Sequence, residues 1–398
     1  MGRSTYHGRY NFIRYLRISI GILTAVLIAN ALIVSTNIQT ADAEAGKILP
    51  VRINEQLEGL TGRCLLYETA DDVISREDIW VMYNALSDED KAVYNLFLDL
   101  AGRQDSTYVS AVVIPEYKLK MLGEKHLWYV YSAMRHDHPE YFYLSASPDI
   151  INCMKISLDD YCIFFFNMVE NDFSEEIQAF EDATAAFMED IDLGLSDLEI
   201  EQQIHDKLID LACYDEYNDI APDEDCSDLK YTAYGALVAN SEGTPNCALC
   251  RGYALAFEHL LHLAGIPCGY VSGEVFRNDS EQDESRVPHA WNLVRIEDKW
   301  YEVDATWDDI TYNPDNGEEY NELMEQETIP YYNWRHHYFN RSTFEMRNLK
   351  VSDDTLFVIE GYYPYNPVKD TSHRRSKKGS ENATETDVFL NSLLPYAR

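Results

Sequence analysis

The strongest constraint on the fold lies in residues 250–304, where a helical pattern gives way to two strand patterns. From Cys250 onward, apolar residues recur at helical spacing as far as the stop signal Gly265-Ile-Pro267. Residues 289–296 and 299–304 then alternate between apolar and polar side chains, with only two residues between them. That alternation predicts two antiparallel strands joined by a tight turn, so we expect α+β structure in this part of the chain.

Alternation along the predicted hairpin brings a histidine and an aspartate together. If the two intervening residues form the turn, His289 and Asp304 lie on the same face of the hairpin. Diagonal neighbours of this kind are about 7 to 8 Å apart at the backbone, which is within side-chain reach. We therefore expect Asp304 to orient the imidazole of His289.

Cys250 occupies the first turn of the predicted helix. There the helix dipole and the unpaired N–H groups favour the thiolate, which lowers the pKa of Cys250 and makes its sulfur a nucleophile. The backbone N–H of Cys250 is then a candidate oxyanion donor. Taken singly, a helix cysteine, a strand histidine and an aspartate are usually packed or solvated residues. Together they supply the nucleophile, base and orienting acid of covalent catalysis.

Three motifs stand out in this stretch: Cys250-Arg-Gly-Tyr-Ala, His289-Ala-Trp-Asn and Trp300-Tyr-Glu-Val-Asp-Ala-Thr-Trp307. They resemble the signatures of the transglutaminase-like superfamily, and more narrowly of its secreted bacterial branch. Matching context at Tyr234-Gly-Ala-Leu237, Ala264-Gly-Ile266 and Tyr338-Phe-Asn340 gives a strong resemblance over residues 234–340, and His138-Pro-Glu-Tyr-Phe142 is a faint upstream echo.

The resemblance implies a papain-like α+β fold, in which the nucleophile helix packs on an antiparallel sheet that bears the histidine and the aspartate. It implies Cys250 as nucleophile, His289 as general base and acid, and Asp304 as the orienting acid. Members of the family attack a glutamine side-chain amide or a peptide bond, form a thioester, and pass the acyl group to an amine or to water. The motifs do not indicate whether the acyl acceptor is an amine or water.

The N-terminal segment predicts export from the cytoplasm. Residues 1–17 carry four arginines and no acid, residues 18–34 are uncharged, and Ala41-Asp-Ala43 follows. This is the pattern of a secretory signal peptide cleaved after Ala43. The alternative is an uncleaved anchor, since an apolar run of this length is at the lower limit for spanning a bilayer. In either case we expect the body of the protein to be secreted or at the cell surface.

The formal net charge of -37 argues against two classes of binding partner, nucleic acids and anionic membrane surfaces. Such a charge repels phosphate backbones and anionic lipid head groups alike, so we expect no nucleic-acid partner and no membrane contact beyond the N-terminal segment. The excess of acidic side chains serves solubility or attracts cationic partners such as lysine-rich proteins and amines.

Four regions are predicted along the chain. A signal peptide spans 1–43, an α+β accessory region 44–170, a transglutaminase-like domain 171–350, and a partly disordered C-terminal extension 351–398. The extension is basic and polar from His373 onward and is predicted to be a mobile, solvated tail.

Within these regions the patterns predict further elements. Two helices are expected between residues 71 and 104 and another over 125–136, with a strand over 108–114 and a strand or hairpin over 153–167. Residues 174–212 are helical with a break before a capping box at Ser196-Asp-Leu-Glu199. His259 and His262 fall on the polar side of the helix that begins at Cys250, so we expect both to be solvated. His336 and His337 have no carboxylate partner that the sequence assigns.

Eight cysteines are too few for a disulfide-built mini-fold, but one departs from the family pattern. Cys247 lies on an approach to Cys250 that is longer than usual for the family. It either pairs with Cys250 as a redox lock, or bonds another cysteine, or stays a thiol.

Cys153 and Cys162 either face each other across a hairpin or remain buried thiols. A zinc site built on Cys247, Cys250 and Cys268 lacks a second ligand pair, so we expect neither metal nor cofactor. The candidate partners for Cys247 other than Cys250 are cysteines 64, 153, 162, 213, 226 and 268.

Two classes of function fit these observations. The first is a secreted or cell-surface thiol enzyme that transfers acyl groups from a protein or peptide substrate, including a cell-wall peptide, to an amine or to water, the last being a cysteine peptidase. The second is a noncatalytic binding or wall-associated module that keeps the triad for structure.

Overall fold

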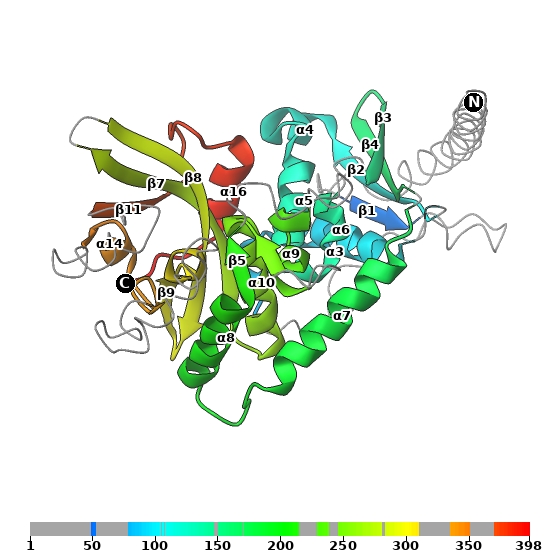
Figure 1. The fold of residues 1–398 in the computed structure, drawn as a ribbon. Helices are drawn as coiled ribbons and strands as arrows, with labels where there is room; N and C mark the ends of the chain where they lie inside the picture. The colour runs from blue at the N-terminus through cyan, green and yellow to red at the C-terminus, as the bar shows by residue number, and fades with distance from the viewer. Residues whose placement is uncertain are drawn as a thin grey trace, which may run out of the picture. The chain divides into compact units, whose positions relative to one another are not determined.

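The structure is a computed structural model, and its described residues fall into two compact units (Figure 1). Of the described residues, the second unit takes in 79–87 and 128–146, from within the predicted accessory region, as well as those from residue 171 onward. The first unit takes in the described residues among 49–52, 88–127 and 150–169. The described residues are 49–52, 79–104, 106, 108–146, 150–169, 171–214, 229–238, 246–280, 283–309, 335–350 and 370–398. The predicted signal peptide lies outside them.

Among the residues described, no helix is both long enough and apolar enough to cross a membrane.

The first unit is a four-stranded antiparallel sheet with the strand order β1-β2-β4-β3. Every residue of β2 is buried, and so are all residues of β4 after the first, which makes these two strands the centre of the core. Phe97 of α3 packs edge-on against Phe166 of β4, with ring centroids 4.9 Å apart. The elements are β1 (Leu49–Arg52), α3 (Asp88–Arg103), β2 (Ser110–Pro115), α4 (Glu116–Leu122), β3 (Ile151–Ser157) and β4 (Tyr161–Met168).

The predicted hairpin over 153–167 is confirmed as β3 and β4, but its two cysteines do not face each other. Cys153 pairs with Phe166, and Cys162 pairs with Ser157 at the far end of the ladder. Cys162 is buried and Cys153 is exposed. The register of the hairpin therefore places Cys162 next to the turn and Cys153 farther along the ladder, so the two cysteines are not opposite each other.

A five-stranded antiparallel sheet with the order β10-β11-β7-β8-β9 forms the core of the second unit. A small parallel pair, β5 and β6, is the other sheet of this unit. The strands are β5 (Ala212–Tyr214), β6 (Asn246–Ala248), β7 (Cys268–Ser280), β8 (Asp283–Ile296), β9 (Lys299–Val303), β10 (Leu349–Lys350) and β11 (Asp370–Arg375).

The helix α10 (Cys250–Leu263) packs on β7 and β8 and is the most buried helix of this unit. Its stop signal is confirmed, because Gly265 has a φ of 78°, a conformation that glycine adopts without strain. The remaining helical segments are α2 (Val81–Ala85), α5 (His126–Asp137, from Trp128 on), η2 (Pro139–Tyr141), α6 (Tyr143–Ala146), α7 (Ser174–Glu189), α8 (Asp197–Leu211), η3 (Leu229–Tyr231), α9 (Ala233–Leu237), α11 (Ala305–Asp308), α14 (Thr343–Met346) and α16 (Glu385–Ser392).

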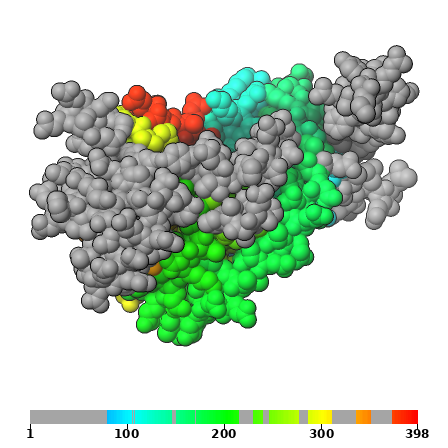
Figure 2. All heavy atoms as spheres, viewed as in Figure 1, coloured from blue at the N-terminus to red at the C-terminus, as the bar shows by residue number. Residues whose placement is uncertain are grey.

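The break predicted before Ser196 separates α7 from α8, whose atoms are drawn in green in Figure 2. The capping box is confirmed: the Ser196 hydroxyl accepts from the Glu199 N–H, and the Glu199 carboxylate accepts from the Ser196 N–H. These reciprocal bonds satisfy N–H groups that have no partner within the helix.

The prediction of a mobile tail from His373 onward is wrong. Residues 370–375 form β11, which pairs with β7, and residues 385–392 form α16. His373 and Arg375 are both buried, as the period of two in a strand requires. The charge of Arg375 is balanced by the buried Glu302 carboxylate, with 2.7 Å between Nη2 and Oε1. A polar segment can therefore be an interior strand, because its inward side chains find polar partners.

Candidate functional site

The start of α10 places Cys250. Leu249 is extended, and Cys250 is the first helical residue, as the sequence predicts. The glycine of the Cys-Arg-Gly motif has a packing reason, since a Cβ on Gly252 would lie 2.6 Å from the carbonyl oxygen of Lys230. A side chain at position 252 would therefore push the helix start away from the segment that carries Lys230.

The hairpin of β8 and β9 places the histidine and the aspartate. Glu297 and Asp298 form the predicted two-residue turn, with φ values of 48° and 62°. Positive φ at both positions is typical of the hairpin turn that matches strand twist. The ladder runs from Ile296 and Lys299 to Asn292 and Val303 and stops there.

The next residue, Asp304, leaves the sheet and caps α11. Its Oδ1 accepts a hydrogen bond from the Trp307 N–H at 3.2 Å. Its Oδ2 remains directed at the imidazole of His289, with Nε2 2.7 Å away. One carboxylate thus ends the strand, begins the helix and holds the histidine.

All three predicted site residues come together. The side chain of His289 and the backbone N–H of Ala290 both interact with the Cys250 sulfur and lower the pKa of the thiol. Because Nε2 of His289 is bound to Asp304, Nδ1 is the ring nitrogen left for the sulfur. Asp304 is fully buried and His289 is 9% exposed, so both groups interact at reduced dielectric.

The electrostatics favour a charged thiolate and imidazolium. Burial opposes the charge on each group, but the Asp304 carboxylate outweighs it at His289 and raises the pKa of the imidazole. At Cys250 burial would raise the pKa, yet the hydrogen bond and the positive charge of His289 bring it below the ordinary value. The Asp304 carboxyl keeps a lowered pKa despite burial because two imidazoles surround it.

The second of those imidazoles is His373, which sequence reasoning missed. Its Nε2 lies 2.7 Å from Oδ2 of Asp304, the same oxygen that His289 contacts. The ring is buried and makes edge contacts with Trp291 and Trp307, with centroids 5.2 and 5.6 Å away. The only sequence signal was the alternation of His373 and Arg375, which a basic, polar segment obscures.

Two further motif residues, Trp291 and Glu302, anchor the sheet behind the site. The indole N–H of Trp291 donates to Glu302 Oε2 at 2.9 Å. The other oxygen of Glu302 accepts from Arg375 and from the Thr343 hydroxyl, the latter at 2.6 Å. This buried network joins β8, β9, β11 and α14, so these motif residues hold the strands that carry His289 and His373.

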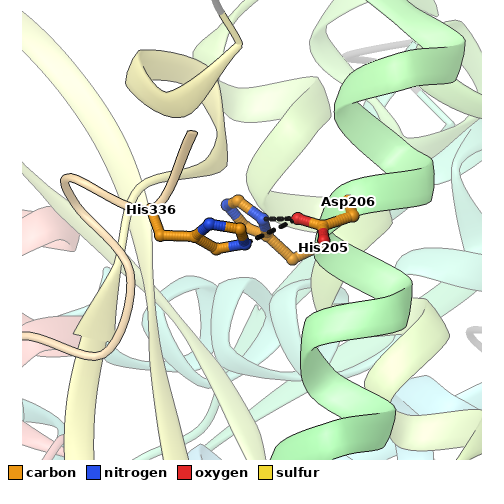
Figure 3. A group of neighbouring side chains, drawn as sticks. All are labelled: His205, Asp206 and His336. Carbon is orange, nitrogen blue, oxygen red and sulfur yellow. Dashed lines mark hydrogen bonds and ion pairs between the residues drawn. The ribbon is translucent and has the colours of Figure 1, made fainter. Parts of the chain in front are cut away.

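His205, Asp206 and His336 form a second histidine cluster (Figure 3), which contacts Asp308, the last residue of α11. His205 of α8 places Nε2 3.2 Å from Asp308 Oδ2 and Nδ1 3.2 Å from Asp206 Oδ1. His336 contacts the same Asp206 oxygen at 2.7 Å, which gives it the carboxylate that the sequence did not assign. Burial would lower the pKa of His205, but the two carboxylates raise it to about 9. Burial raises the pKa of Asp308 to about 6.

Both clusters have the geometry of possible metal ligands within the described part of the chain. In each, three ligand atoms lie within 4.8 Å of one another: His205, Asp206 and His336 in one, and His289, Asp304 and His373 in the other. In each, however, a single carboxylate oxygen is hydrogen-bonded to both imidazoles. These hydrogen bonds are sufficient to explain why the three side chains of each cluster lie close together.

The expectation of solvated histidines on α10 is wrong. His259 is buried, with its ring 5.0 Å from that of Phe180. His262 is half-buried and donates from Nε2 to the Cys268 carbonyl oxygen at 2.9 Å. Burial lowers the pKa of both imidazoles. The helix is enclosed on more sides than its sequence pattern indicated, because the segment around Glu140 also lies against it.

That segment contains the faint echo His138-Pro-Glu-Tyr-Phe142. Glu140 lies 4.0 Å from Nδ1 of His259, and the ring of Phe142 lies 4.9 Å from that of Tyr234. The echo therefore belongs to the second unit, where it packs beside the motifs that gave the main resemblance.

Cys247 lies beside Cys213. The two residues are opposite each other in the parallel pair of β5 and β6, and their sulfur atoms are 2.6 Å apart. Of the alternatives for Cys247, the structure therefore favours a contact with another cysteine, Cys213, over a contact with Cys250.

Parts of this chain are similar in sequence to known proteins. Residues 189–305 match the family model of the transglutaminase-like superfamily. The kyphoscoliosis peptidase of Homo sapiens is 37% identical over 68 residues, and that of Mus musculus is 35% identical over 68 residues. Each match covers 15% of this chain and 9% of the relative, so the chain matches only a small part of these proteins.

A TGase of known crystal structure is 16% identical, with a TM-score of 0.27 over 43% of this chain and 48% of its own. The part of this chain that is similar to the transglutaminase-like superfamily is thus residues 189–305, which include Cys250, His289 and Asp304.

Proposed function

We propose that this protein is a thiol enzyme that transfers acyl groups from protein or peptide amides through a thioester at Cys250. The observation that carries the proposal is the continuous chain of contacts from the Cys250 sulfur to His289 and from His289 Nε2 to Asp304 Oδ2 at 2.7 Å. Nucleophile, base and orienting acid within hydrogen-bonding reach of one another are the geometric signature of this chemistry.

In the proposed reaction the Cys250 thiolate attacks the amide carbonyl carbon. The negative oxygen of the tetrahedral intermediate accepts from the backbone N–H of Cys250 at the helix start. The His289 imidazolium gives its proton to the departing nitrogen, and the carbon–nitrogen bond breaks to leave a thioester. His289 then takes a proton from the acceptor as the acceptor attacks, and the thiolate leaves as the acyl product forms.

The acceptor is an amine or water, and the substrate is a protein or peptide, including a cell-wall peptide. The curated relatives carry the name peptidase, which supports water as acceptor. The strongly acidic chain favours amine-rich acceptors by attraction. The leader pattern in residues 1–43 supports action outside the cytoplasm, in the secreted form or at the cell surface.

The second candidate is a noncatalytic binding or wall-associated module. Its support is that much of the site also serves structure: Asp304 caps α11, and the rings of His373 and Trp291 lie beside His289, with centroids 5.6 and 6.2 Å away. A module of this kind would keep the triad and turn over nothing.

The decisive experiment is an acyl-transfer assay with a matched variant. The purified chain is incubated with a glutamine peptide and a primary amine, and with an extract of surface proteins. Ammonia release, isopeptide bonds, deamidation and new peptide termini are measured. We expect one of these products with the wild type and none with Cys250→Ala. Equal product from both proteins, or none from either across the extract, would rule the enzyme out and leave the module.

A further inference from the structure

A pair of cysteines outside the triad lies at the base of the nucleophile helix. Cys213 is the middle residue of β5, which directly follows α8, and Cys247 is the middle residue of β6, three residues before Cys250. The parallel strands β5 and β6 set Cys213 and Cys247 directly opposite each other. The register of the backbone, and not a chance rotamer, thus brings the two thiols together.

The geometry of this pair suits a covalent bond. Neighbouring strands lie about 4.7 to 4.9 Å apart, and a disulfide needs Cα atoms about 4.4 to 6.8 Å apart. The two sulfur atoms are 2.6 Å apart, so only a small movement of either side chain is needed to form a disulfide bond.

The surroundings of the pair disfavour thiolates. The nearby Tyr253 hydroxyl donates to Asp309 Oδ2 at 2.5 Å. Burial, followed by the negative charge of Asp309, raises the pKa of Tyr253, and ionised Cys213 and Cys247 would raise it further. Two neighbouring thiolates beside a buried carboxylate would repel one another, whereas a disulfide carries no charge.

We propose that Cys213 and Cys247 form a disulfide when the protein meets a small-molecule disulfide such as oxidised glutathione. Cys247 is the more accessible of the two, so its thiol loses a proton to water and its sulfur attacks a glutathione sulfur; the glutathione disulfide breaks, and the departing glutathione thiolate takes up a proton. Cys213 then loses its proton in the same way as its sulfur attacks the Cys247 sulfur of the mixed disulfide, and the second glutathione leaves and is protonated. The two cysteines are oxidised by two electrons, and one oxidised glutathione becomes two reduced molecules.

The bond would tie the end of α8 to the residues that lead into α10. It would also engage the Cys247 sulfur and thereby keep it from pairing with Cys250 in the Cys-x-x-Cys sequence. This protective role rests on the proposed function, because it matters only if the Cys250 thiol is the nucleophile. The disulfide itself does not depend on that function.

Linkage mapping tests the disulfide without any activity assay. The full chain is equilibrated with a glutathione redox buffer, alkylated with N-ethylmaleimide, digested, and analysed by mass spectrometry. We expect peptides joined through Cys213 and Cys247, and a Tm about 5 to 10 °C higher than that of the reduced protein. Cys162→Ser, a buried cysteine of the first unit, is the matched control and should retain the linkage.

Alkylation of Cys213 and Cys247 after full oxidation would overturn the proposal. So would a linkage of Cys247 to Cys250, Cys226 or Cys64 in the wild-type chain. Circular dichroism of Cys213→Ser and Cys247→Ser would show whether each variant folds, while the wild-type linkage remains decisive in either case.

The protective role has its own test in Cys213→Ser. With Cys213 removed, oxidation should join Cys247 to Cys250 and reduce iodoacetamide labelling of Cys250 at least fivefold, with recovery after reduction. Unchanged labelling would overturn the protective role. An enzyme that is inactive but carries the mapped linkage would contradict only the proposed function.

Discussion

Two histidines of the second unit are held by the two ends of one short helix, and they differ in what faces their other ring nitrogen. Asp304, which caps α11, holds His289 through Nε2, and Asp308, the last residue of α11, holds His205 through Nε2. The remaining nitrogen of His289 is left for the Cys250 thiol. The remaining nitrogen of His205 faces a second carboxylate.

The difference decides which histidine can move a proton. An imidazolium between two carboxylates, as at His205, is stabilised in its charged form, and both of its ring nitrogens are engaged by carboxylate oxygens. An imidazolium between a carboxylate and a thiolate, as at His289, can give its proton away and take one back. A carboxylate-held histidine is therefore not in itself a catalytic site.

The first test of this contrast is to remove the imidazoles of His289 and His205 one at a time. His289→Ala should lower the rate of acyl transfer by a factor on the order of 10⁴ or more, as loss of the base does in enzymes of this type. His205→Gln should leave the rate within a few-fold, because His205 does not contact the reacting atoms. Ammonia or peptide release under saturating substrate gives both rates. Similar losses in the two variants would mean that the clusters act alike and that the contrast is wrong.

The second prediction concerns the charge state of Cys250. Because His289 lowers the pKa of this thiol, iodoacetamide should alkylate Cys250 rapidly below the ordinary thiol pKa. His289→Gln should slow alkylation at pH 6.5 by about 10- to 100-fold, because the thiol loses the imidazole that lowers its pKa. His205→Gln is the matched control and should alkylate at the wild-type rate. The measurement is the rate of mass gain at the Cys250 peptide as a function of pH, and a profile that His289→Gln leaves unchanged would contradict the pairing.

The third prediction sharpens the role of His373, which we infer to be a positioning residue that acts through Asp304. His373→Ala removes one of the two donors on Asp304 Oδ2, so kcat should fall about tenfold while KM stays constant. His373→Gln places an amide donor in the same strand position and should restore most of kcat. A parallel rise in KM, or a failure of glutamine to recover what alanine loses, would indicate a packing role only.

The site was more predictable from sequence than its surroundings, and the reason is the range of the interactions. Cys250 follows from helix periodicity, and His289 with Asp304 follows from strand alternation and a two-residue turn, all of which are local patterns. His373 comes from β11, which joins the sheet far from its neighbours in sequence, and no local pattern reports that pairing.

Other expectations depended on partners that a single sequence does not reveal. Burial of His259 arises from the segment around Glu140, and the register that separates Cys153 from Cys162 depends on where the turn falls. The catalytic roles, the export of the chain, its domain boundaries and its place in a bacterial branch of the family stay predictions.

The smallest expected effect is the contribution of His205 to stability, which should depend on pH. Its folded pKa of about 9 lies above the ordinary value of 6.5, so the charged imidazole stabilises the folded state fully below pH 6.5. That stabilisation is lost as the pH rises through 9. Because Asp206 is partly exposed, we expect a loss on the order of 1 kcal/mol and not the full value of the shift.

Urea unfolding at pH 6.5 and pH 9 measures this loss, in the wild type and in His205→Gln. The free energy of unfolding should fall more steeply with pH in the wild type, since the glutamine has no charge to lose. Asp206→Asn keeps the imidazole but removes one of its two carboxylates, so its loss should occur at lower pH than in the wild type. A wild-type stability that rises between pH 6.5 and pH 9 relative to His205→Gln would mean that His205 is buried in its neutral form. In that case the two histidine clusters would differ in charge as well as in the group that each one faces.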